Sequence, residues 1–242
     1  MKLGKTPATP DQRDLCFSAY RAGPLPPRPR VCGHEGAVAL WGMLGNDTVG
    51  DCVFAGAAHE TILWTTETGH PAPFTAASVL SDYSAVTGYD PTDPNSDQGT
   101  DVRTALKYRA KTGLLDATGK RHRIGAYVRV SGRIEIEEAV YLIGTAGVGI
   151  QFPSSAMDQF NAGRRWSIVS GSPIEGGHYI PLVALRGDLY CVTWGKLQPL
   201  TRAFLTKYCD EAWAILSPEM LTGGTSLEGF DLAQLQADLK AL

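Results

Sequence analysis

Several patterns that mark metal-binding, nucleotide-binding and membrane proteins are missing from this 242-residue sequence. It contains neither CxxC nor HExxH, the spacings in which zinc is commonly held. It also lacks GxxxxGKS/T and GxGxxG, the loops that cradle nucleotide phosphates. No apolar run approaches the length of a membrane-spanning helix. We therefore expect no metal, no cofactor and no membrane association.

Cysteine is scarce, and charge of either sign is nearly balanced. The cysteines are Cys16, Cys32, Cys52, Cys191 and Cys209. An odd, scattered set argues against a disulfide framework and suits a reducing compartment. The net charge of −3 includes neither a basic face nor an acidic tail, so nucleic acid is not an expected partner. Residues 1–7 hold no apolar stretch of a secretory signal, so we expect the chain to be cytoplasmic when it is synthesised.

The most informative stretch present is Gly45–His59, in which a loop rich in Gly, Asn and Asp runs into an Ala-rich helical pattern. Cys52 lies at the junction. A thiol at a helix N-terminus is close to unpaired N–H groups and to the positive end of the helix dipole, and both favour the nucleophilic thiolate. His178, after Glu175-Gly176-Gly177, is the candidate base. The alternative is a buried core cysteine and a structural histidine beside a turn.

The first half of the chain is predicted to be mainly helical. Apolar periodicity predicts a helix over residues 51–66. Thr75 is a suitable cap for a second helix over 76–86 that ends at Gly88. Thr100 or Asp101 caps a third, which reaches about residue 112 and is closed by Gly113.

The second half is predicted to consist largely of strands. These cover residues 123–130, 148–152, 179–185, 189–194 and 211–216, with helices over 134–145 and 201–208. Residues 186–188 form a hairpin turn. Pro181 within a strand indicates an edge position or a bulge.

Three regions follow from these patterns. Residues 1–35 form a Pro-rich arm, which should be extended and ordered only where it lies on something. Residues 36–217 form the body, with a helical lobe over about 36–120 and a β lobe over about 121–217. Residues 218–242 form a tail that ends in an amphipathic helix with a leucine stripe. The stripe either docks on the chain's own body or binds a partner.

This order of elements, a helical half that opens with a cysteine and a strand half that carries a histidine, resembles the papain-like cysteine peptidases. Asn46, six residues before Cys52, stands where the family has a glutamine that donates to the oxyanion. Residues 97–115 are similar to the glycine-rich wall of the family's cleft and its following helix, and 177–183 to its catalytic-histidine strand. Residues 192–195 (Val-Thr-Trp-Gly) fall where the family has Asn-Ser-Trp-Gly. The resemblance covers roughly residues 24–216.

The resemblance implies an α+β fold of two lobes, with Cys52 on the helical N-terminal lobe and His178 on an antiparallel sheet or barrel lobe. It implies Cys52 as nucleophile, His178 as base, and Asn46 as oxyanion donor. Trp194 would shield the histidine. The implied cleft residues are Gly50, Asp51, Gln98, Gly99 and Gly177.

The sequence also departs from the family. Valine at 192 cannot orient an imidazole, so Thr193, shifted by one residue, and Glu175 are the alternatives for that role. Asn46 is shorter than glutamine by one methylene, and Asp51 places a negative charge beside the thiol, which opposes the thiolate. Because only residues 1–44 precede the cysteine loop, we expect the family's long inhibitory N-terminal segment to be absent.

Two functions remain open. The first is a cysteine hydrolase that cleaves an amide in a peptide or in peptidoglycan. The second is a catalytically silent scaffold in a phage particle, since the chain also resembles uncharacterised proteins of actinobacterial phages and prophages that share its Gly-Asn-Asp…Gly-Asp-Cys and Gly-Gly-His sequences. In that case the chain would be incorporated into a phage virion after its synthesis, and residues 1–35 and 219–242 would bind other virion proteins or a second copy of the chain.

Overall fold

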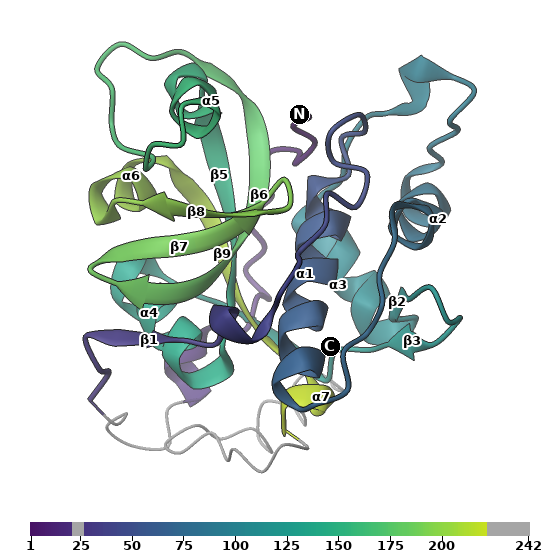
Figure 1. Ribbon diagram of the computed structural model, residues 1–242, viewed down its shortest axis with the longest axis horizontal. Helices are drawn as coiled ribbons and strands as arrows, with labels where there is room; N and C mark the ends of the chain where they lie inside the picture. Colours follow the sequence, from purple (N-terminus) through teal and green to yellow (C-terminus); the bar gives the residue numbers. More distant parts are fainter. Residues whose placement is uncertain (21–26, 222–242) are drawn as a thin grey trace.

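The computed structural model describes residues 1–20 and 27–221, and these form two lobes that lie side by side (Figure 1). One lobe holds α1 (Cys52–Glu67), α2 (Ala76–Thr87), α3 (Val102–Lys111) and a small hairpin of β2 (Leu114–Leu115) and β3 (Arg121–His122). The other is built on an antiparallel sheet. No described helix is both long and apolar enough to cross a membrane.

The helices of the first lobe begin and end where their capping residues predict. Thr75 and Ser78 form a reciprocal capping box at the start of α2, and Gly88 ends that helix in the left-handed conformation. The Asp101 side chain accepts from the Thr104 N–H at the start of α3, so the cap is Asp101. Helix α1 is buried along nearly its whole length, because it packs on the other helices on one side and on the sheet on the other.

The sheet has seven strands in the order β4-β9-β5-β6-β7-β8, with β1 paired to β6. The strands are β1 (Val31–Gly33), β4 (Ala126–Arg129), β5 (Ala146–Pro153), β6 (Ile174–Arg186), β7 (Asp188–Thr193), β8 (Lys196–Leu200) and β9 (Cys209–Leu216). Helices α4 (Gly132–Ile143), α5 (Ser154–Asn161) and α6 (Arg202–Tyr208) pack on it, and α7 (Pro218–Leu221) lies beside α1. Short 3-10 turns cover Phe17–Tyr20, Glu35–Ala37 and Pro94–Ser96.

Several expectations for the strands need correction. The strand predicted over 123–130 is confined to Ala126–Arg129, and β1, α5 and β8 were not predicted. β6 has neighbours on both sides, so Pro181 is not at a sheet edge. It precedes Leu182, the first β6 residue that pairs with β7, so Pro181 is paired with β5 alone, and the β6–β7 register shift follows between Leu182 and Ala184. The predicted leucine-stripe helix lies outside the described residues.

β7 and β8 are joined by a two-residue loop, Trp194-Gly195. Both residues have positive φ, 47° and 71°, as a type I′ hairpin turn requires. Glycine adopts this conformation freely, whereas tryptophan does so at a cost of about 1–2 kcal/mol. The usual sequence of this turn is Asn-Gly or Asp-Gly, so β8 had no recognisable turn signal.

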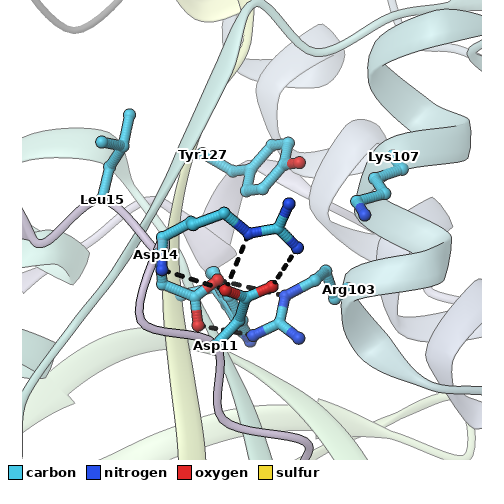
Figure 2. A pocket seen from close by; sticks show the side chains of 8 residues that line it. Asp11, Asp14, Leu15, Arg103, Lys107 and Tyr127 are labelled. Carbon is cyan, nitrogen blue, oxygen red and sulfur yellow. Dashed lines mark hydrogen bonds and ion pairs between the residues drawn. The ribbon is translucent and has the colours of Figure 1, made fainter. Parts of the chain in front are cut away.

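The described parts of the Pro-rich arm lie on the body. Phe17 is fully buried in the core of the sheet lobe. Figure 2 shows how Asp14 is held: the Arg103 guanidinium of α3 donates to it, with Nε at 3.1 Å. Arg103 also donates to the Thr9 carbonyl at 2.7 Å. Asp14 and Arg103 line a cavity of about 210 Å³, and Tyr127 also lines it. The arm is ordered because it packs against its own chain.

A histidine clamp ties the small hairpin to α7. His122 Nδ1 lies 2.6 Å from Glu219, and Nε2 lies 3.0 Å from Asp116. Burial lowers the pKa of His122, but the hydrogen bonds to Glu219 and Asp116 outweigh it, and the pKa is raised. A raised folded-state pKa means that the protonated ring stabilises the fold.

We expect this stabilisation to be complete below the unfolded pKa of about 6.5 and to be lost as pH rises through the raised folded-state pKa. The His122→Asn variant should lose that part of the pH dependence. Urea unfolding across the neutral pH range measures it, with the exposed His70→Asn as the matched control. An unchanged slope in His122→Asn would contradict the prediction.

Candidate active site

Cys52 is the first residue of α1, and its side chain faces the sheet lobe across the boundary between the lobes. It is only 1% exposed. Burial raises the pKa of its thiol to about 12, although hydrogen bonds from the backbone of Tyr179 and Gly4 lower it. Burial therefore outweighs the helix terminus that favours the thiolate, and the thiol is neutral at physiological pH.

Asp51, which precedes Cys52, is also buried. Burial raises the pKa of its carboxyl to about 8, so this group is largely protonated at neutral pH. The negative charge that the sequence places beside the thiol is therefore mostly absent at neutral pH.

His178 lies on β6, and two residues at the β7–β8 turn fix its ring. Its Nε2 is 2.7 Å from Thr193 Oγ1, and its plane stacks on Trp194 at 4.5 Å between centroids. Burial lowers the pKa of His178 to about 3, so the imidazole is neutral. Nδ1 is buried and has no hydrogen-bond partner among the described residues. In the tautomer whose Nε2–H donates to Thr193, Nδ1 is the ring nitrogen left to accept a proton.

The two lobes bring the predicted residues to one place. Asn46, Cys52, Thr193 and Trp194 line the same small cavity between the lobes. The Cys52 thiol is bonded to the backbone of Tyr179, the residue that follows His178. His178 is linked to this cavity through Thr193 and Trp194, the two lining residues that contact its ring.

The other predicted residues divide into two groups. Gly50, Gly99 and Gly177 line the groove beside Cys52, as described below, whereas Gln98 is exposed and donates to the Asn95 carbonyl at 2.6 Å. Glu175 is exposed on β6. The hydrogen-bond partner of His178 Nε2 is the Thr193 hydroxyl, so the orienting role falls to Thr193 and not to Glu175.

Residues 2–6 of the same chain fill the groove. The Lys5 N–H donates to the Gly177 carbonyl at 3.1 Å, and the Thr100 N–H donates to the Gly4 carbonyl at 2.7 Å. Nearer the cavity, the Lys2 carbonyl accepts from Asn46 Nδ2 and from Trp194 Nε1, each at 3.4 Å. The segment runs as an added strand between the two lobes.

Glycines on both sides permit this close approach. A Cβ on Gly4 would lie 1.7 Å from the Gly50 carbonyl oxygen, and one on Gly99 would lie 2.1 Å from the Gly4 carbonyl oxygen. A Cβ on Gly177 would lie 2.2 Å from the Lys5 carbonyl oxygen. A short segment of residues 2–6 in this groove was not predicted from the sequence. Its one signal was a glycine at position 4, which on its own indicates nothing.

No protein-family model matches this chain, and no curated protein matches it. Solved structures do. Xylellain, a cysteine protease from Xylella fastidiosa, aligns with a TM-score of 0.66 and 14% identity over 89% of this chain and 96% of that one. Procathepsin B S9 from Trypanosoma congolense aligns with a TM-score of 0.61 and 12% identity over 89% and 86%. The Carica candamarcensis cysteine protease CMS1MS2, in complex with E-64, aligns at 0.55 and 14% over 78% and 99%. The two-lobe α+β fold is that of papain-like cysteine proteases.

Proposed function

We propose that this chain, which has the papain-like fold, is a cysteine hydrolase of the peptidase or amidase class that its own residues 2–6 keep latent. The observation that carries the proposal is the state of His178. Thr193 and Trp194, which line the same cavity as Cys52, hold its ring, and its Nδ1 has no hydrogen-bond partner among the described residues. A buried imidazole nitrogen normally has a hydrogen-bond partner, so the unpartnered Nδ1 is available to take a proton.

The reaction follows from these positions. Cys52 Sγ attacks the carbonyl carbon of an amide while His178 Nδ1 takes the thiol proton. The Asn46 amide and the Cys52 backbone N–H donate to the oxyanion. His178 then gives the proton to the leaving amine as the C–N bond breaks, which leaves a thioester on Cys52. Water, deprotonated by His178, attacks the thioester and releases the acid and the free thiol.

Thr193 replaces the family's asparagine as the group that orients the ring. Its hydroxyl oxygen accepts from Nε2–H at 2.7 Å, which keeps the proton on Nε2 and the lone pair on Nδ1. The ring of Trp194 covers one face of the imidazole and shields this bond from water.

Latency follows from the segment over the site. Gly4 presents an N–H to the thiol, whereas a substrate must present a carbonyl carbon. With the segment in place, the thiol has a pKa of about 12 and the imidazole a pKa of about 3, so proton transfer from Cys52 to His178 is strongly disfavoured. Activity requires that residues 2–6 leave the groove.

The test compares variants in a Gly4→Val background, since a side chain at this position cannot fit against Gly50. We expect Gly4→Val to hydrolyse fluorescently quenched casein. Adding Cys52→Ala or His178→Ala should reduce the rate about 1,000-fold or more. The exposed Cys16→Ala is the control and should retain the rate.

Hydrolysis that survives Cys52→Ala would contradict the proposal. Failure of every variant to hydrolyse casein or other amide substrates, together with no selective alkylation of Cys52, would favour the alternative, a silent papain-like component of a phage particle.

A further inference from the structure

The Lys5 side chain leaves the strand of residues 2–6 and ends in a pocket with an acidic floor. Its Nζ lies 2.9 Å from Asp210 and 3.0 Å from Glu211, two residues at the start of β9. The Lys5 side chain is 0% exposed, and the two acidic side chains are 18% and 5% exposed. Burial lowers the pKa of Lys5, but Glu211 and Asp210 outweigh it and raise the pKa, so the ammonium is charged.

The wall of this pocket leaves room for a long side chain. A Cβ on Gly149 of β5 would lie 2.1 Å from Lys5 Cε and 2.7 Å from Glu211 Cγ. Any other residue at 149 would therefore obstruct the methylene stem. The pocket has the depth of a lysine side chain because this strand position is glycine.

The pocket is next to the reacting thiol. Gly4, one residue before Lys5, donates its N–H to Cys52, and the Lys5 N–H donates to the carbonyl of Gly177, which precedes His178. The bonds that hold residues 4–6 are main-chain bonds to Gly177 and Thr100, and any extended peptide can form them. A substrate that replaces the segment will thus place a side chain in the same pocket.

Removing Lys5 leaves two largely buried carboxylates without a cation. Such a pair is costly unless a new positive charge enters, because carboxylates taken out of water need hydrogen-bonded partners of opposite charge. We infer that the substrate supplies this charge: the Asp210–Glu211 pocket selects a lysine or arginine side chain on the residue adjacent to the one bound at Cys52. The inference rests on the proposed function of the site.

The test uses the Gly4→Val chain and a series of peptides that differ at one position, which carries Lys, Arg, Met or Glu. The position is scanned over the two residues on either side of the scissile bond. At the position that enters the pocket, we expect kcat/KM for Lys and Arg to exceed that for Met by about 10- to 100-fold, and Glu to be the poorest.

Variants of the floor connect this preference to the pocket. Glu211→Gln should reduce the ratio of Lys to Met about tenfold, and Asp210→Asn should act in the same direction. The control is Asp158→Asn, an exposed acid on α5, which should leave the ratio unchanged. Hydrolysis without a basic preference, or a preference untouched by both floor variants, would overturn the inference and leave the proposed function standing.

A second measurement does not depend on catalysis. Lys5→Ala in the otherwise unchanged chain empties the pocket, and n-butylammonium chloride should raise its melting temperature more than sodium chloride at equal ionic strength. Adding Glu211→Gln should abolish the difference. If no peptide is hydrolysed, the proposed function fails, and this rescue decides whether the pocket binds a cationic side chain. Equal effects of the two salts would overturn the inference.

Discussion

Replacing Arg109 by methionine should lower the free energy of unfolding by about 3–5 kcal/mol, because it leaves Glu60 buried without its cation. Arg109 Nη1 lies 2.6 Å from Glu60 Oε2, and the Tyr179 hydroxyl donates to Glu60 Oε1 at 2.7 Å. Both charged side chains are almost completely buried, and they join α1, α3 and β6. Methionine fills much of the space and keeps the helix propensity, so the loss reports the charge.

The loss should depend on pH. Burial raises the pKa of Glu60, and Arg109 opposes that rise. Without Arg109, the folded-state pKa rises further above the unfolded value, so the destabilisation is small in acid and grows as pH increases. Urea unfolding at pH 5 and pH 8 measures this difference.

Two variants control the experiment. Lys107→Met removes an exposed positive charge from the same helix and should cost less than about 0.5 kcal/mol. Adding Glu60→Gln to Arg109→Met should recover part of the loss, because the buried charge is gone. A loss in Arg109→Met no larger than that in Lys107→Met would show that the Glu60 carboxylate is not isolated when its partner is removed.

The second large effect concerns the thiol. Gly4→Val should increase the rate at which iodoacetamide alkylates Cys52 on the order of a thousandfold at pH 7.5. The valine side chain cannot fit beside the Gly50 carbonyl, so residues 2–6 must leave the groove. The pKa of the exposed thiol then falls from about 12 towards the ordinary value, about 8.5, and the thiolate fraction increases tenfold per pKa unit.

The other cysteines provide internal standards in the same digest. Cys16 is exposed and should react equally in both chains, whereas Cys191 lies in the core and should stay protected. Gly36→Val is the matched substitution, because a Cβ there meets no atom within 4 Å. An increase at Cys191 equal to that at Cys52 would indicate general unfolding, and an unchanged Cys52 would show that the segment does not control access.

Local signals in the sequence predicted most of the helices. The predicted cap Thr75 starts α2, Asp101 is the one of the two predicted caps that starts α3, and Gly88 ends α2. The helix predicted over 201–208 is α6, with Thr201 as its cap. These features depend on neighbours within a few residues, which the sequence displays directly. The two-lobe fold was predicted from the order of motifs that resemble a family.

The features that the sequence did not reveal depend on distant contacts. The direction of the Cys52 pKa is set by burial between the lobes, among side chains far from it in sequence such as Tyr179 and Val192. The strand β8 was missed because a tryptophan occupies a turn position that normally favours asparagine. His178 and Thr193 come together because β6 pairs with β7, and this pairing cannot be read from the sequence. Thr193 and Glu175 therefore stayed open as alternatives for the residue that orients the imidazole.

At the Trp194-Gly195 turn, the residue that best suits the backbone conformation differs from the residue that best holds His178. The turn positions both groups that hold His178, since Thr193 is the last residue of β7 and Trp194 is the first of the loop. Asparagine at 194 would relieve the left-handed backbone, but it would remove the ring that stacks on the imidazole. Selection of this chain for heat resistance alone would therefore favour a substitution at residue 194 that weakens the histidine site. Selection for both stability and reactivity of the site would avoid that outcome.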